Sequence, residues 1–152
     1  MEKKPSARRN IARNKRALFD YEILERHECG IVLVGTEVKS LRAGKVSLAE
    51  AYGRFLEGEL FLLGLNIAEY EHGNRMNHDP TRPRKLLLHR RELHQLRAKV
   101  HEKGLTVVPL AIYFKASLVK VELGLGRGKR KYDKREKLRK EEHRREIDRS
   151  YR

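Results

Sequence analysis

Alternating apolar positions characterise residues 18–35 and predict β-strand structure there. Residues 31–34 are apolar and largely β-branched, which favours a second strand after the first. Residues 28–30 include a glycine and can turn or bulge the chain between these two strands. The alternating apolar residues of the first strand are Phe19, Tyr21 and Ile23.

Short strand patterns return later in the chain. Residues 51–65 predict a hairpin, because Gly58 near their middle can adopt the positive φ of a tight turn. Residues 105–114 and 117–124 are rich in apolar and β-branched side chains, so two further strands are expected. Since Pro109 cannot donate a backbone hydrogen bond, its strand is expected to lie at an edge or to bulge there.

Two segments show helical spacing instead. Residues 36–42 predict a short helix that Thr36 can cap and that Gly44 can end. Residues 90–102 predict a longer helix, because leucine and valine recur there at intervals of three and four residues. Gly104 follows as a C-terminal stop for this helix.

The order of these elements indicates the fold class. Many short strands, few helices and no alternation of strand, helix and parallel strand predict a mainly β protein with some α structure. We expect an antiparallel β-barrel of the oligonucleotide-binding type, decorated by about three helices. Residues 68–85, rich in glycine, asparagine and proline, are expected to form a polar loop.

Charge is concentrated at the two ends of the chain. The 152 residues include 36 Lys and Arg against 21 Asp and Glu, a formal net charge of +15. Residues 1–16 carry +6 and residues 126–152 carry +7, which leaves only +2 for residues 17–125. Two basic ends on a nearly neutral body favour a nucleic-acid partner over a merely solubilising role.

Three regions follow from this distribution. We expect a basic N-terminal arm over residues 1–16, a β-barrel domain over residues 17–128 and a basic C-terminal tail over residues 129–152. The tail has strong helix formers but few apolar residues, so an isolated helix would have no face to bury. We expect it to be disordered when free and to fold against RNA, while a solvated helix without a function stays the alternative.

Composition and motifs exclude several protein classes. No apolar run approaches the roughly 18–20 residues that span a bilayer, so no membrane protein is expected. The one cysteine, Cys29, cannot form an internal disulfide, and a reducing cytoplasm is expected. Glycines at 124–128 fit neither a Walker loop nor a dinucleotide fingerprint, and predict a flexible hinge before the tail. Because no motif for catalysis, a cofactor or a metal is found, an enzyme is not expected.

Five segments together carry a family resemblance. The second and the last are specific motifs, and all five follow one another across residues 11–135. On these segments the chain resembles the small protein B family, the tmRNA-binding (SsrA-binding) proteins of bacterial trans-translation. The segments are residues 11–17, 35–45, 79–88, 103–114 and 128–135.

The resemblance implies a function and partners. It implies an adaptor without catalytic activity or cofactor that binds the tRNA-like domain of tmRNA and delivers alanyl-tmRNA to stalled ribosomes, for ribosome rescue and nascent-chain tagging. The implied partners are tmRNA, the stalled ribosome with its ribosomal RNA, and elongation factor Tu with GTP. The protein is expected to be a monomer, one per tmRNA. Its tail is expected to become helical in the empty mRNA channel of the ribosome.

The resemblance also implies the RNA-binding residues, whose cations would contact phosphates and whose tyrosines would stack on bases. For tmRNA they are Asn14, Lys15, Arg16, Tyr21, Glu28, Gly30, Lys39, Arg42, Arg82, Arg84, Lys85 and Leu87. For the decoding centre they are Gly128, Lys129, Tyr132, Asp133, Lys134 and Arg135 in the tail. Alternatives stay open. Lys39 and Arg42 could pair with Glu37 or another acid, and Glu28 could pair with a local base. Tyr21 and Leu87 could be core residues.

Two rival functions stay open. A ribosome-associated structural RNA-binding protein would have the same basic composition. A nuclease using His78 and Asp79 is the other candidate, although a solvated pair in a polar loop explains these two residues better.

Overall fold

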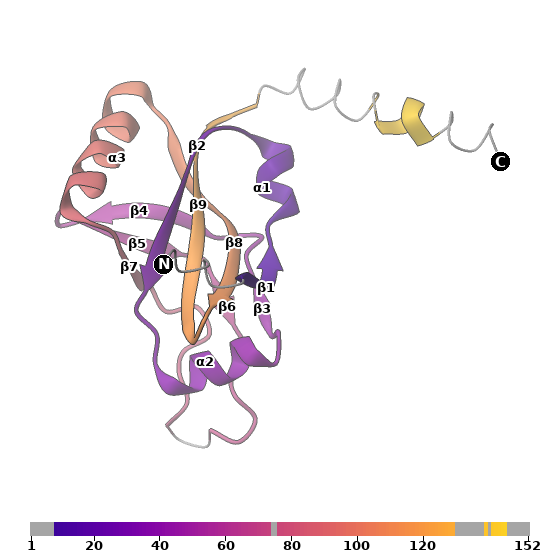
Figure 1. Cartoon of the computed structure of the whole chain (residues 1–152), viewed down its shortest axis with the longest axis vertical. Coiled ribbons are helices and arrows are strands. Elements are labelled where there is room, and N and C mark those ends of the chain that lie inside the picture. The colour runs from indigo at the N-terminus through magenta and orange to yellow at the C-terminus, as the bar shows by residue number, and fades with distance from the viewer. Residues whose placement is uncertain (1–7, 74–75, 130–138, 140, 146–152) are drawn as a thin grey trace, which may run out of the picture.

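The computed structural model describes residues 8–73, 76–129, 139 and 141–145, which form a mainly antiparallel β structure with short helices (Figure 1). The strands are β1 (Arg8–Arg13), β2 (Tyr21–Ile31), β3 (Val46–Ser47), β4 (Tyr52–Leu56), β5 (Glu59–Leu63), β6 (Asn66–Ile67), β7 (Arg84–Leu87), β8 (Thr106–Lys115) and β9 (Leu118–Gly128). The helices are α1 (Lys15–Asp20), α2 (Gly35–Arg42) and α3 (Arg90–Lys103). A fourth helical segment is described at residues 139 and 141–145.

Six strands form a nearly closed ring. Their order is β8, β4, β5, β7, β2 and β9, and β9 pairs again with β8. Neighbouring strands in this ring run antiparallel. Between β4 and β8 the join rests on one pair, Gly53 with Val107. β1 adds to β8 outside the ring, and β3 pairs with β6 in a separate two-stranded sheet.

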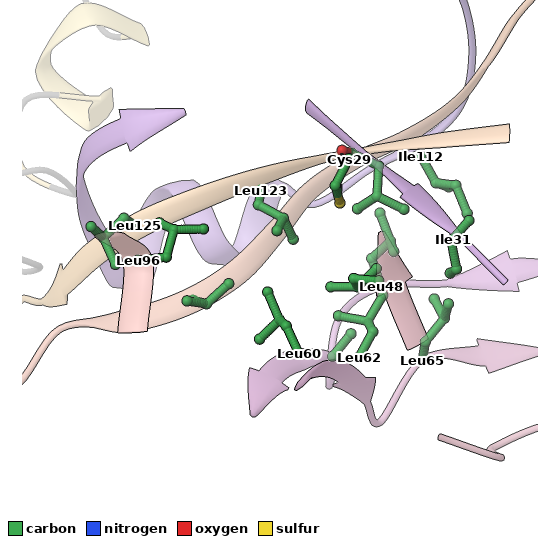
Figure 2. Close-up of a cluster of buried hydrophobic side chains, with 14 of the residues drawn as sticks. Cys29, Ile31, Leu48, Leu60, Leu62, Leu65, Leu96, Ile112, Leu123 and Leu125 are labelled. Atoms are coloured by element: carbon green, nitrogen blue, oxygen red, sulfur yellow. Dashed lines mark hydrogen bonds between the residues drawn. The ribbon is translucent and has the colours of Figure 1, made fainter. Parts of the chain in front are cut away.

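Leucine and isoleucine side chains fill the interior of the ring (Figure 2). Leu60 and Leu62 of β5 are fully buried, as are Leu123 and Leu125 of β9. Their two-residue spacing follows from the strand geometry, which turns alternate side chains to one face. Leu96 joins the same cluster and holds α3 against the ring. Each such leucine contributes roughly 1.5–3 kcal/mol by burial.

Several local predictions are confirmed. The hairpin of β4 and β5 turns at Glu57 and Gly58, with φ of 51° and 80°. Helix α3 ends at Gly104, whose φ of 63° is left-handed. The register between β8 and β9 shifts between Pro109 and Ala111, so the strand bulges where the proline lacks its donor.

The prediction of strand structure for residues 18–20 is wrong. Residues 18–20 are helical, because the Asn14 side chain caps α1 by accepting a hydrogen bond from the Ala17 N–H at 3.1 Å. Strand β2 passes through residues 28–30 without a turn, and its register shift lies between Ile23 and Glu25 instead. The alternating pattern was therefore correct for β2 but extended too far toward the N-terminus.

The predicted hinge at residues 124–128 is also wrong. These residues are the end of β9 and pair with β2. A Cβ on Gly124 would lie 3.0 Å from the Leu110 side chain, and one on Gly126 would lie 3.0 Å from the Glu22 carbonyl oxygen. The glycines thus permit close packing of strands.

The predicted N-cap of α2 is also wrong. Val34 rather than Thr36 occupies the cap position, and its N–H donates to Oε1 of Glu37 at 2.9 Å. The Thr36 hydroxyl instead hydrogen-bonds Nδ1 of His78 at 2.9 Å.

The described part of the basic N-terminal segment belongs to the sheet. Arg8 begins β1, and its guanidinium lies 3.8 Å from the Tyr113 ring centroid. The same guanidinium pairs with Glu122 at 2.6 Å. Residues 8–13 are therefore held against β8 rather than extending from the body.

Candidate RNA-binding surface

The first group of predicted residues lies at the α1 end of the ring. Lys15 and Arg16 are exposed on α1, and Arg16 pairs with Glu50 at 2.7 Å. Asn14 is only 4% exposed. Its amide donates to the carbonyl oxygens of Leu48 and Pro109, at 3.1 and 2.9 Å. Asn14 therefore fixes the start of α1 and presents Lys15 and Arg16, while offering little surface itself.

The start of the tail lies beside this group. Gly128 pairs with Tyr21 across β9 and β2, and the Lys129 N–H donates to the Asp20 carbonyl oxygen at 2.9 Å. Tyr21 is half-buried and lines a hollow with Asn14 and Arg16. Tyr132, Asp133, Lys134 and Arg135 lie outside the described residues.

The same hollow contains an aromatic residue that the sequence analysis missed. Tyr52 of β4 is 43% exposed. An exposed tyrosine can stack on an unpaired base. Its outward position on a hairpin strand was the available signal.

A second group lies where β2, β7 and β9 meet. Gly30 pairs with Leu87 on one side and with Lys120 on the other. Leu87 is 50% exposed, so it is not a core residue, and it shares a hollow with Glu28 and Lys120. Lys120 was also missed, because its partner Gly30 across the β2–β9 pairing is 90 residues away in sequence.

Glu28 already has protein partners in this group. The Tyr113 hydroxyl donates to its carboxylate, and Lys115 pairs with it at 3.1 Å. The hydrogen bond from Tyr113 is the main reason that the pKa of Glu28 lies below its ordinary value, and Lys115 adds to the effect. Glu28 is therefore an anion held next to Lys115, as the local-pairing alternative expected.

Lys39 and Arg42 are exposed on α2. The Lys39 ammonium lies 5.3 Å from the Tyr70 ring centroid. Neither cation pairs with Glu37, whose carboxylate is engaged by Arg82 and Arg84. The alternative that Lys39 and Arg42 form ion pairs with Glu37 is therefore wrong.

The three basic residues at the end of the polar loop differ in accessibility. Arg84 is fully buried, with Nε 2.5 Å from Glu37 Oε2 and Nη1 2.6 Å from the Leu65 carbonyl oxygen. Arg84 exposes no surface to RNA, so the prediction that it contacts tmRNA directly is wrong. Arg82 is partly exposed, although its guanidinium binds the buried Glu37 carboxylate. Lys85 is partly exposed and lies 3.6 Å from the Glu59 carboxylate.

The histidine proposed for a nuclease is a structural residue. His78 is 7% exposed, with Nε2 2.8 Å from the Ile67 carbonyl oxygen and Nδ1 bonded to Thr36. With both ring nitrogens engaged, neither is free to move a proton or bind a metal. Within the described ranges no group of three or more histidine, cysteine or acidic residues is placed to hold a metal ion.

Comparison with known proteins decides the family. The family model described as SmpB protein matches residues 11–152. The chain belongs to the SmpB family. The SsrA-binding protein of Carboxydothermus hydrogenoformans is 54% identical over 142 residues, which cover 93% of this chain and 95% of that protein. The SsrA-binding protein of Geobacillus sp. (strain WCH70) is 54% identical over 93% of this chain and 92% of its own length.

A solved structure supports the same assignment. A chain of the structure described as "tmRNA-SmpB: a journey to the center of the bacterial ribosome" matches with a TM-score of 0.67 and 56% identity. The match covers 84% of this chain and 94% of that chain. Among the described helices of the present SmpB-family chain, none is long and apolar enough to cross a membrane.

Proposed function

We propose that this chain binds the tRNA-like domain of tmRNA and delivers alanyl-tmRNA to stalled ribosomes, where the nascent chain is tagged. The observation that carries the proposal is the 54% identity with SsrA-binding proteins across 93% of the chain. SsrA RNA is tmRNA, and the similarity spans nearly the whole chain rather than one segment of it. The chain acts as an RNA-binding adaptor and is not an enzyme.

The tmRNA interface would combine the accessible members of the predicted set. Lys15 and Arg16 would neutralise phosphates, and Tyr21 would stack on a base at the α1 end. Lys39, Arg42, Arg82 and Lys85 would add further phosphate contacts. Glu28, Gly30 and Leu87 would form the second group, whose glycine lets the RNA approach the backbone closely. Asn14 and Arg84 would act from inside the fold by holding α1, α2 and β7 in place.

The tail would serve the ribosome. Residues 129–152 are highly charged and have few apolar side chains, which supports disorder in the free protein and helix formation against RNA. Gly128 and Lys129 would lead the tail from the α1 end into the empty mRNA channel. Tyr132, Asp133, Lys134 and Arg135 would then contact the decoding centre.

The remaining assignments complete the proposal. The ring of strands would be an oligonucleotide-binding-type barrel that takes the place of the anticodon arm that tmRNA lacks. The protein would act in the cytoplasm as a monomer, one per tmRNA, in a complex with elongation factor Tu and GTP. The barrel assignment is supported by the ring of six antiparallel strands with helices outside it.

Direct binding tests the proposal. Fluorescence anisotropy with the transcribed tRNA-like domain of tmRNA should give saturable binding that an elongator tRNA competes for poorly. Leu87→Asp should weaken binding roughly tenfold, because it places a carboxylate in the interface. Leu56→Asp is the matched control, since Leu56 is 37% exposed on β4, outside the predicted set. Equal affinity for the elongator tRNA and the tRNA-like domain would refute the proposal.

A further inference from the structure

A hollow at the turn between β8 and β9 brings together residues from three parts of the fold. Arg9 of β1 and Arg42 of α2 line it with Phe114, Ala116 and Ser117. The Arg9 guanidinium lies 5.1 Å from the Phe114 ring centroid, so the aromatic ring supports it. Helix α2 lies at the end of the ring where β8 turns into β9 (Figure 1).

The charge of this hollow is unusual for this surface. No acidic side chain is among its described lining residues. Four other hollows on the described surface each include at least one carboxylate. Their acidic residues are Asp20 and Glu50, Glu28 and Glu92, Glu69 and Glu71, and Glu102.

The two arginines also lack internal counter-charges. Arg8, Arg16 and Arg26 each pair with a glutamate within 2.9 Å. In the part of the chain that the structure describes, Arg9 and Arg42 have no carboxylate within ion-pair distance. Two unpaired guanidinium groups beside a serine hydroxyl form a set of donors for an anion.

We propose that Arg9, Arg42 and Ser117 form a binding site for a phosphodiester group of RNA. Guanidinium groups match the geometry of phosphate oxygens, and the stack on Phe114 limits the conformational entropy that Arg9 loses on binding. Only Arg42 of this site was expected from the sequence. The inference rests on the proposed function, and deepens it by assigning the phosphate to the tRNA-like domain of tmRNA.

Paired substitutions test this site. Arg9→Gln with Arg42→Gln should weaken binding of the transcribed tRNA-like domain roughly tenfold near 0.1 M salt, as expected for the loss of one phosphate contact. The slope of log affinity against log salt should become shallower by about 0.7–0.9. Because both arginines would contact the same phosphate, the single variants should not be additive.

The matched control removes the same charge elsewhere. Arg54→Gln with Arg97→Gln affects two exposed arginines on β4 and α3, outside the hollow. This control should change affinity by about twofold at most and leave the slope nearly unchanged. Should loss of Arg9 loosen β1, Arg42→Gln alone keeps the test valid, because Arg42 is exposed in the last turn of α2.

The outcomes separate this site from the wider proposal. If the native protein binds the tRNA-like domain and the paired variant behaves like the control, the phosphate site is refuted and the tmRNA function stands. If the native protein does not bind that RNA, the proposed function itself fails. If the paired variant loses only its association with vacant ribosomes, the phosphate belongs to ribosomal RNA, which overturns the assignment to tmRNA.

Discussion

At the scale of single residues, Glu37 organises the α2 side of the molecule. Its buried carboxylate is bound by the Arg82 and Arg84 side chains and by the Val34 N–H. Burial raises the pKa of Glu37, but these hydrogen bonds outweigh burial and hold the pKa below its ordinary value. Two of the predicted RNA-binding arginines therefore depend on one acid 45 and 47 residues away in sequence.

Replacement of this acid should be strongly destabilising. Glu37→Gln leaves the Arg84 charge buried without its counter-charge, and we expect a loss of about 3–5 kcal/mol in the free energy of unfolding. Urea denaturation measures this loss. Glu71→Gln is the control, because Glu71 pairs with Lys45 on the exposed surface, and it should unfold like the native protein. Equal stability of the two variants would contradict the structural role of Glu37.

Glu37 should also make the free energy of unfolding depend on pH. Since the pKa of Glu37 is lower in the folded protein than in the unfolded chain, its contribution is complete above the ordinary value of 4.5. That contribution should be lost as the pH falls through the lowered folded-state pKa. Urea midpoints measured from pH 7 downward should fall more steeply for native protein than for Glu37→Gln. Parallel curves would show that Glu37 does not contribute.

At the scale of elements, the ring depends on a close approach of β4 and β8. Gly53 pairs with Val107 there, and a Cβ on Gly53 would lie 2.7 Å from Val107 Cγ1. Such a distance is too short for two carbon atoms, so the strands can meet only because this position has no side chain. With one residue pair, the β4–β8 pairing is the shortest strand pairing in the ring.

A side chain at this point should strain the closure. Gly53→Ala should lower the free energy of unfolding by roughly 1–3 kcal/mol through overpacking. In the double variant with Val107→Ala, the added methyl group gains room and the strain should be relieved in part. Thermal unfolding of the single and double variants tests this, with Val107→Ala alone as the reference. Strict additivity of the two substitutions would refute the clash.

Sequence patterns predicted the elements whose determinants are local. The turn at Gly58, the helix end at Gly104 and the bulge at Pro109 each follow from the backbone chemistry of one residue. The end of β9 did not, because Gly124 and Gly126 reflect the approach of distant strands rather than a flexible hinge.

The candidate RNA-binding residues could likewise be predicted only where their exposure depends on local sequence. Sequence motifs named Lys15 and Leu87, which are exposed, but also Arg84, which is buried. Burial of Arg84 follows from its pairing with a distant glutamate, which no local pattern indicates. Lys120 was missed for a similar reason, since its place beside Gly30 depends on strand pairing.

At the scale of the whole molecule, the charge of +15 is concentrated at the two ends of the chain. Residues 126–152 carry +7 and have little to pack, whereas the described body has a ring core and exposed basic groups on α1 and α2. We therefore expect RNA capture by the body and ribosome recognition by the tail to be separable.

Truncation tests this separation. A chain that ends after Gly128 should bind tmRNA nearly as well as the full chain, because β9 is complete at that residue. It should fail to support tagging of nascent chains on stalled ribosomes in a translation assay. Loss of tmRNA affinity as large as that of Leu87→Asp would contradict the division of tasks.

The RNA that co-purifies with the protein from cells tests the central claim most directly. An adaptor should carry tmRNA in about equal molar amount. In a separate titration, the logarithm of its affinity for tmRNA should fall with the logarithm of salt concentration at a slope of roughly −3.5 to −4.5 if about five phosphates are neutralised. Sequencing of the bound RNA identifies the partner. We predict that tmRNA dominates and that high-salt washing removes the protein from ribosomes. Ribosomal RNA as the bound species, with one protein per ribosome retained through the wash, would contradict the adaptor function.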